Sequence, residues 1–352
     1  MKTKYFHGFD LLRGLAAFSV FFSHAAGMYN IDKPFYIAIF SDGHAAVILF
    51  FVLSGFVLTY NNLFVEKFNL INFITKRLFR IYPMFIVSIC IAFILKEFFY
   101  NELNVVNTSE WFKSLWDSQI DAKLFFQTIL MVIPNFNHSA INPVIWTLIV
   151  EVYASFILPL FIVVLRKNLF YILIFTILLF LSPYIFNIAQ LHYFFIFYIG
   201  SLYAKYFKEI NTICIGQLKN ITIIAVAMYL FGIYKMNYNF IIDYFISDYI
   251  IAMGSIGLMI VVVNAHSIIN IASREYSKYI GKISYSFYLL HFPILLTLVS
   301  LLSNTLELHT IIIISFISTL FVSKITFEKV ELRGIQLGKK IITYVRNKRE
   351  SV

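Results

Sequence analysis

Long apolar segments alternate with short polar ones along this chain of 352 residues. Segments long enough to cross a hydrocarbon core of about 30 Å occur about ten times. They cover residues 11–27, 45–60, 84–99, 144–165, 169–186, 193–206, 221–234, 249–264, 283–302 and 311–325. A shorter apolar stretch, 124–132, is expected at an interface. The pattern predicts an all-α integral membrane protein, a polytopic bundle of about ten transmembrane helices.

Composition agrees with a membrane protein. Hydrophobic residues make up 60% of the chain and charged residues only 13%, and the mean hydropathy is +0.82, values that are unusual for a soluble domain. We find no internal repeat and no appended soluble segment, so a single transmembrane domain, 1–352, is expected, with a basic cytoplasmic tail at about 327–352. Cys90 and Cys214 are far apart and suggest neither a disulfide framework nor a metal site.

The distribution of basic residues predicts the orientation, because cytoplasmic loops carry an excess of Lys and Arg. With the N-terminus inside, 22 of the 27 basic residues other than Arg13 fall on the cytoplasmic side, and both termini are cytoplasmic. The five exceptions are Lys33, Lys96, Lys113, Lys123 and Lys235. The net charge of +10 is then explained by topology and contact with membrane lipids, and nucleic-acid binding is not implied.

The first apolar segment carries two polar residues, Arg13 and His24, whose placement in a membrane costs free energy. In a helix, eleven positions at about 100° each leave the two side chains about 20° apart around the axis and about 16 Å apart along it. They therefore lie on one face. With Lys2 and Lys4 ahead of it, this segment also resembles a signal peptide. Cleavage of such a peptide would remove both Arg13 and His24. We expect the segment to be retained as the first span.

Two further arginines precede the third predicted span. Arg77 and Arg80 are three positions apart and share a helical face. They are consistent with a positive-inside anchor, but together with Arg13 they would also form a cytoplasmic pocket for a phosphorylated cofactor.

Deeper polar residues accompany His24. His291 lies in a late span, and Glu151 and Trp146 lie near the outer end of the fourth. Each alone is explained by a hydrogen bond between helices. Together they suggest one midplane cavity with a base, a carboxylate and aromatic walls.

Five motifs of this chain occur in the same order in a known family. They are Arg13-x10-His24, Phe50-Phe-Val-Leu-Ser54-Gly55-Phe56, Arg77-x-x-Arg80, Trp146-x4-Glu151, and Ile283-Ser-Tyr-Ser-Phe-Tyr288-Leu-Leu-His291-Phe-Pro. Between residue 9 and about residue 293 the chain thus resembles the acyltransferase-3 family of integral membrane O-acyltransferases.

This resemblance implies a multi-pass enzyme of the bacterial inner membrane. Such an enzyme moves an acyl group, usually acetyl, from cytoplasmic acyl-coenzyme A to a hydroxyl of a surface polysaccharide, lipopolysaccharide or exopolysaccharide. The resemblance also implies that acetyl-coenzyme A is the donor and that no metal is needed. The implied site consists of catalytic His24 and Glu151, cofactor-binding Arg13, Arg77 and Arg80, and substrate-binding Trp146, His291, Tyr288 and Ser54.

The implied chemistry suits a histidine. An imidazole with a pKa of about 6.5 can act as general base on a sugar hydroxyl. It can also accept the acyl group covalently before passing it on. Both routes stay open at this point, as do the acceptor sugar, the oligomeric state and any partner protein.

One departure and two alternatives accompany the resemblance. Many members carry a polar residue where this chain has Ile48, so its function would pass to His44 or Asp42. Within the family, a succinyl thioester is the alternative donor and an amine the alternative acceptor. From another class, a transporter or flippase for a lipid-linked sugar or a small anion would also have ten spans with buried charges, although no paired half-repeats favour it.

Overall fold

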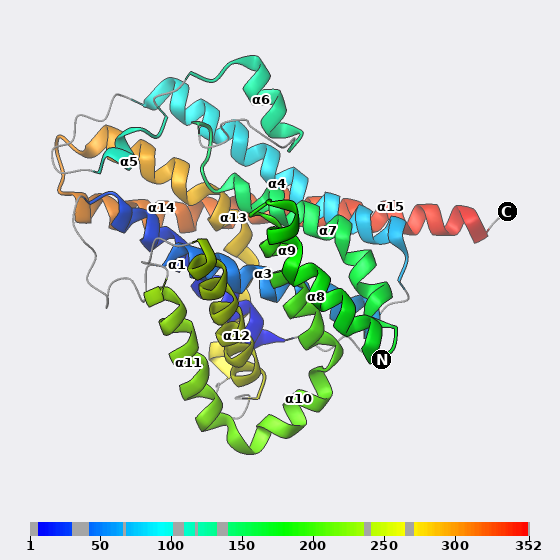
Figure 1. The fold of residues 1–352 in the computed structure, drawn as a ribbon. Coiled ribbons are helices and arrows are strands. Elements are labelled where there is room, and N and C mark those ends of the chain that lie inside the picture. Colours follow the sequence, from blue (N-terminus) through cyan, green and yellow to red (C-terminus); the bar gives the residue numbers. More distant parts are fainter. Residues whose placement is uncertain are drawn as a thin grey trace. The chain divides into compact units, whose positions relative to one another are not determined.

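The computed structural model describes residues 6–29, 42–65, 68–100, 109–116, 119–131, 140–235, 241–264 and 271–350. Within these residues the chain is helical and contains no sheet (Figure 1). The main helices are α1 (His7–Gly27), α3 (Gly43–Tyr60), α4 (Leu70–Phe99), α5 (Glu110–Lys113), α6 (Ala122–Ile129), α7 (Ile145–Leu165), α8 (Leu169–Phe186), α9 (Leu191–Lys205), α10 (Phe207–Cys214), α11 (Leu218–Lys235), α12 (Ile241–Asn264), α13 (Ile271–Leu302), α14 (Leu308–Thr326) and α15 (Leu332–Glu350). The predicted all-α fold class is confirmed. Of the short stretch 124–132, residues 124–129 lie on α6, and residue 132 lies outside the described residues.

Seven of these helical segments are long and apolar enough to cross a membrane, and the bent pair α10–α11 would make an eighth. Each of the ten predicted segments falls on a helix. Two of these helices, α1 and α9, are not among those long and apolar enough to cross a membrane. Helix α9 has only 15 residues, and α1 contains Asp10, Arg13 and His24 among its 21. The chain is a multi-pass membrane protein. The count of ten spans and the cytoplasmic termini stay predictions.

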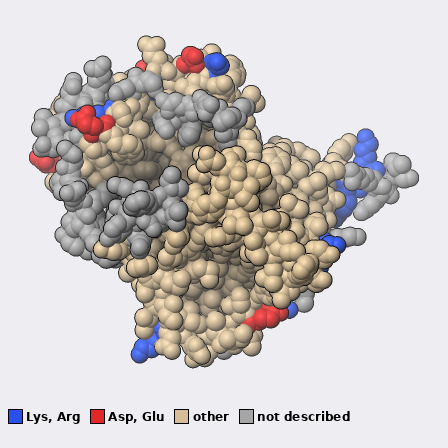
Figure 2. Space-filling view, in the orientation of Figure 1, with Lys and Arg blue, Asp and Glu red and all other residues tan. Residues whose placement is uncertain are grey.

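Exposed apolar side chains identify surfaces that suit lipid. On α8, Leu169, Phe170, Leu173 and Ile177 are each more than half exposed. An apolar surface of this kind is costly in water and is stable against lipid tails. In the view of Figure 2 most of the described surface is uncharged, and Lys and Arg side chains gather over the outer part of α15.

The described chain divides into two compact units. Unit 1 contains residues 1–20, 34–69 and 150–281, and unit 2 contains residues 21–33, 70–149 and 282–352. Helices α1, α7 and α13 contribute residues to both units. The expectation of one domain over 1–352 stays a prediction.

In unit 1, helices α3 and α9 approach each other at two glycines. A Cβ added at Gly55 would clash with the carbonyl oxygen of Phe197, and one at Gly200 would clash with that of Val52. Small residues let two membrane helices bring their backbones together. The same pair is joined by a fully buried hydrogen bond of 2.8 Å from Thr59 Oγ1 to Ser201 Oγ.

In unit 2, helix α15 packs along α4. Pro83 has no N–H for the carbonyl of Phe79 one turn earlier. Gly334 of α15 covers this carbonyl, since a Cβ at that glycine would lie 2.7 Å from the oxygen. Gly338, one turn further, packs on the Phe79 side chain. The segment predicted as a basic tail is therefore a helix packed on one face.

Helix α14 continues into α15 through the π-helical segment Phe327–Glu331. The basic side chains of α15 that the structure describes are exposed, namely Arg333, Lys339, Lys340, Arg346 and Lys348. Such a helix suits the border between lipid and water, with apolar contacts on one side and hydrated charges on the other.

Candidate active site

Two predicted site residues are in direct contact in unit 2. His24 lies in the last turn of α1, and His291 lies on α13. Nδ1 of His24 is 2.9 Å from Nε2 of His291, and the two rings are nearly parallel, at 8°. His291 is fully buried, whereas His24 is half-buried. His24 is therefore the member of the pair that a substrate can reach.

A backbone carbonyl determines where the protons of this pair lie. Nδ1 of His291 is 2.7 Å from the carbonyl oxygen of Tyr288. A carbonyl can only accept, so this nitrogen carries a proton. In a neutral ring Nε2 of His291 is then the acceptor, and Nδ1 of His24 donates to it. Nε2 of His24 consequently holds the lone pair, as in a hydrolase triad where the partner of one ring nitrogen sets the basicity of the other.

A hydrogen bond at a proline anchors the helix that carries His291. Pro293 lacks an N–H, which leaves the carbonyl of Leu289 without its usual helical partner. The side-chain amide of Asn142 donates to this carbonyl over 2.9 Å, and Asn142 is fully buried. Asn142 is a residue that the sequence analysis missed, because its partner is 147 positions away.

The hydroxyl of Tyr288 is also engaged. It lies 2.8 Å from Oγ1 of Thr147, which itself donates to the carbonyl of Val144 over 3.0 Å. The single Thr147 proton is thus used, so Tyr288 is the donor to Thr147. These bonds hold the first turn of α7 against α13. Trp146, beside Thr147, is half-buried.

An aromatic wall faces His24. The ring of Phe292 meets it edge-on at 4.6 Å between centroids, and Trp111 of α5 stacks at 6.2 Å. Ser109 holds α5 in place: its Oγ donates to the Gly27 carbonyl over 2.6 Å. Sequence reasoning missed Trp111, and the only local signal is Ser109 as the N-cap of a short helix.

One of the two arginines of α4, Arg80, has a buried partner that the sequence did not indicate. Nη2 of Arg80 is 3.7 Å from Oε1 of Glu331, and the exposed fractions of the two side chains are 41% and 0%. Oε2 of Glu331 accepts a 2.9 Å hydrogen bond from Ser286 Oγ. The carboxylate therefore holds Arg80 by charge while much of the arginine side chain stays accessible. Arg77, one turn earlier, is half-buried.

The remaining predicted residues belong to unit 1. Arg13 lies on α1, Ser54 on α3 and Glu151 on α7, and each is half-buried. The structure thus unites His24, His291 and Tyr288. The roles expected for Arg13, Ser54, Glu151 and Trp146 stay predictions.

No group of three or more His, Cys, Asp or Glu side chains suited to hold a metal ion occurs among the residues that the structure describes.

Comparison with known proteins identifies relatives of the chain. The family model described as an acyltransferase domain, acyltransferase-3, matches residues 6–328. A protein of Shigella phage Sf6 named O-acetyl transferase is 24% identical, over 92% of this chain and 95% of its own. No solved structure matches the chain significantly.

Proposed function

The chain belongs to the acyltransferase-3 family, and from this premise we propose that it is an O-acetyltransferase of the bacterial inner membrane. It would move the acetyl group of cytoplasmic acetyl-coenzyme A to a hydroxyl of a cell-surface or exported carbohydrate. The family favours an enzyme over the transporter or flippase considered above. The name of the phage relative, O-acetyl transferase, supports acetyl as the group transferred.

The basic nitrogen of His24 is the observation that carries this proposal. Both chemical routes that the sequence left open need a lone pair at Nε2, because this nitrogen either takes the hydroxyl proton or attacks the acyl carbon. The hydrogen bond of 2.9 Å to His291 supplies that tautomer. His291 is then a positioning residue rather than the substrate contact expected from sequence.

Arginines suit the donor end of the reaction. The planar guanidinium groups of Arg77 and Arg80, one helical turn apart, match the phosphates of coenzyme A. Glu331 would hold Arg80 in place for them. Arg13 is proposed as a third phosphate ligand and Glu151 as a catalytic carboxylate. Ser54, Trp146 and Tyr288 are proposed near the carbohydrate.

An acetyl-transfer assay tests the proposal. Membrane vesicles that contain the full chain are given [14C]acetyl-coenzyme A and the surface glycan of the native cells. Wild type should label the glycan, and His24→Ala should label it at least about 100-fold more slowly, since general-base or nucleophilic catalysis is worth this much. Donor binding should be unchanged. Full labelling by His24→Ala, at equal protein level, would remove His24 from the mechanism.

A further inference from the structure

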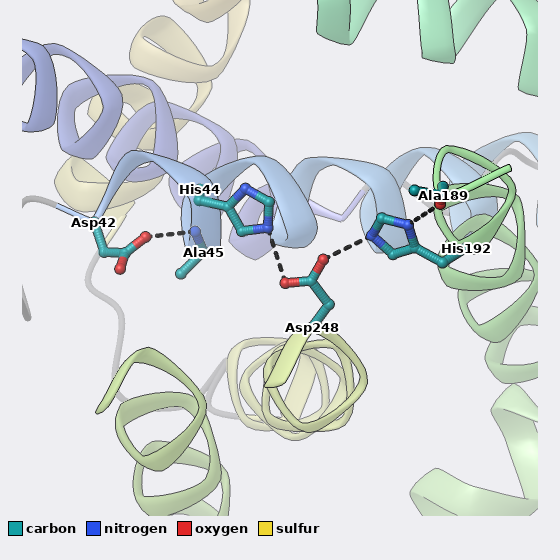
Figure 3. A network of polar contacts seen from close by, with 6 residues as sticks. All are labelled: Asp42, His44, Ala45, Ala189, His192 and Asp248. Atoms are coloured by element: carbon teal, nitrogen blue, oxygen red, sulfur yellow. Dashed lines mark hydrogen bonds and ion pairs between the residues drawn. The ribbon is translucent and has the colours of Figure 1, made fainter. Parts of the chain in front are cut away.

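A second polar cluster with two histidines lies in unit 1. Asp248 of α12 lies between His44 of α3 and His192 of α9 (Figure 3). Its Oδ1 is 2.8 Å from Nε2 of His44, and its Oδ2 is 2.8 Å from Nε2 of His192. The described rings that contact these histidines, Tyr193 and Phe245, are 7% and 4% exposed. Neither ring offers an open face to a ligand, and the cluster is explained by polar bonds between three helices.

The histidine cluster of unit 2 differs, because a largely exposed ring belongs to it. Trp111 of α5 is 45% exposed, although it stacks against His24 with 6.2 Å between the ring centroids. Phe292 meets both of these rings edge-on and is fully buried. The open side of the cluster is therefore formed by Trp111 and the half-buried His24.

The chain on both sides of Trp111 is held in place. The backbone N–H of Ser109 donates to the carbonyl of Met28 over 2.8 Å, next to the bond that its hydroxyl makes to α1. Phe112, which follows Trp111, is fully buried. A single exposed apolar side chain is common on protein surfaces. Here the exposed ring lies on an anchored turn and beside the proposed catalytic histidine, and this combination indicates a binding surface.

The neighbouring tryptophan shows what an indole with only a structural role looks like. Trp116 is 2% exposed, and its indole N–H donates to the carbonyl of Ile141 over 2.9 Å. The indole N–H of Trp111 has no acceptor within the described part of the chain. Trp111 therefore offers a ligand both an open ring face and a hydrogen-bond donor.

The position of Trp111 along unit 2 separates it from the proposed phosphate site. The hydroxyl of Tyr100 donates to the carbonyl of Leu115 over 3.1 Å, which places the segment of Trp111 beside the C-terminal end of α4. Arg77 and Arg80 lie near the start of the same helix, about twenty positions earlier and thus about 30 Å away along its axis. The nucleotide end of the donor, if bound by these arginines, does not reach Trp111.

We propose that Trp111 binds the carbohydrate acceptor, with a pyranose ring stacked on its open face and a hydroxyl of that ring directed to Nε2 of His24. This inference rests on the proposed acyl transfer. The C–H bonds on one face of a pyranose carry partial positive charge, which the negative face of an indole attracts. The indole N–H donates to an oxygen of the same sugar. Trp111 is thus a substrate-binding residue that selects acceptors with an apolar sugar face.

Two substitutions of Trp111 in the full chain test the inference, in vesicles with [14C]acetyl-coenzyme A and glycan from cells that lack the gene. Trp111→Leu removes the ring and should lower kcat/KM for the glycan about tenfold to 100-fold, mainly through KM, because buried tryptophan contacts are worth this much. The dissociation constant of acetyl-coenzyme A should stay within about twofold. Trp111→Phe keeps a ring face and loses only the donor, so its kcat/KM should stay within about tenfold of wild type.

Phe126→Leu is the matched control, because Phe126 of α6 is also an exposed ring of unit 2, at 62%. Its kinetics should equal those of wild type. Wild-type kinetics for Trp111→Leu would assign the ring to the membrane interface, where tryptophans gather, and would overturn this inference alone. A weaker donor affinity with an unchanged KM for the glycan, or an equal loss in Phe126→Leu, would overturn it as well. A wild-type protein that labels no glycan would overturn the proposed function, and the inference with it.

Discussion

At the scale of single residues, the chemistry depends on which nitrogen of an imidazole carries the proton. The sequence identified His24 and His291 as costly polar groups in membrane segments, and both are found in one site. It could not predict their hydrogen bond, since 267 positions separate them. Nor could it predict the tautomer, which depends on the Tyr288 carbonyl. The contact between His192 and Asp248 was missed for the same reason, because 56 positions separate the two residues in the sequence.

Substitution of His291 tests the tautomer argument. His291→Gln offers an amide oxygen to Nδ1–H of His24, whereas His291→Phe offers no acceptor. We expect His291→Gln to keep activity within about tenfold of wild type, and His291→Phe to lose about 100-fold or more in kcat with little change in KM. Acetyl transfer at saturating donor is the measurement. Equal rates for the two variants would mean that His291 does not act through its acceptor nitrogen.

At the scale of helices, apolar runs predicted where helices lie better than where they end. Helix α4 begins at Leu70 and α12 at Ile241, both well before the predicted segments 84–99 and 249–264. An apolar run corresponds only to the part of a helix that lies in the hydrocarbon core, whereas the helix itself continues into polar residues such as Arg77. The sequence predicted only a basic cytoplasmic tail where α15 lies, because the basic residues obscure the face that packs on α4 through Gly334 and Gly338.

The arginine face of α4 predicts donor affinity. Replacing Arg77 and Arg80 by Ala removes the two proposed ligands of the donor phosphates, and each such charged contact is worth about tenfold to 100-fold in affinity. The dissociation constant of acetyl-coenzyme A should rise accordingly, as measured by equilibrium binding to purified protein. Lys167 and Lys208 are exposed and serve as matched controls. An equal effect of Lys167→Ala and Lys208→Ala would favour the positive-inside anchor.

At the scale of the whole molecule, composition was the strongest guide. Sixty per cent hydrophobic residues and exposed apolar faces such as that of α8 both indicate a lipid environment, and the family match covers residues 6–328. The acceptor has no comparable signature, because a sugar hydroxyl is recognised by a few polar groups brought together by folding. In the predicted orientation the proposed donor arginines lie on the cytoplasmic side, so that the proposed reaction would carry acyl groups across the bilayer.

The most direct test of this account is mass spectrometry of the surface glycan. Cells that carry the wild-type gene are compared with cells that carry only His24→Ala at equal protein level. We expect acetyl-sized mass increments on the glycan of the first strain and their loss in the second, with the amount of glycan unchanged. Identical acetylation in both strains, or a change in the amount of exported glycan alone, would contradict the proposed function.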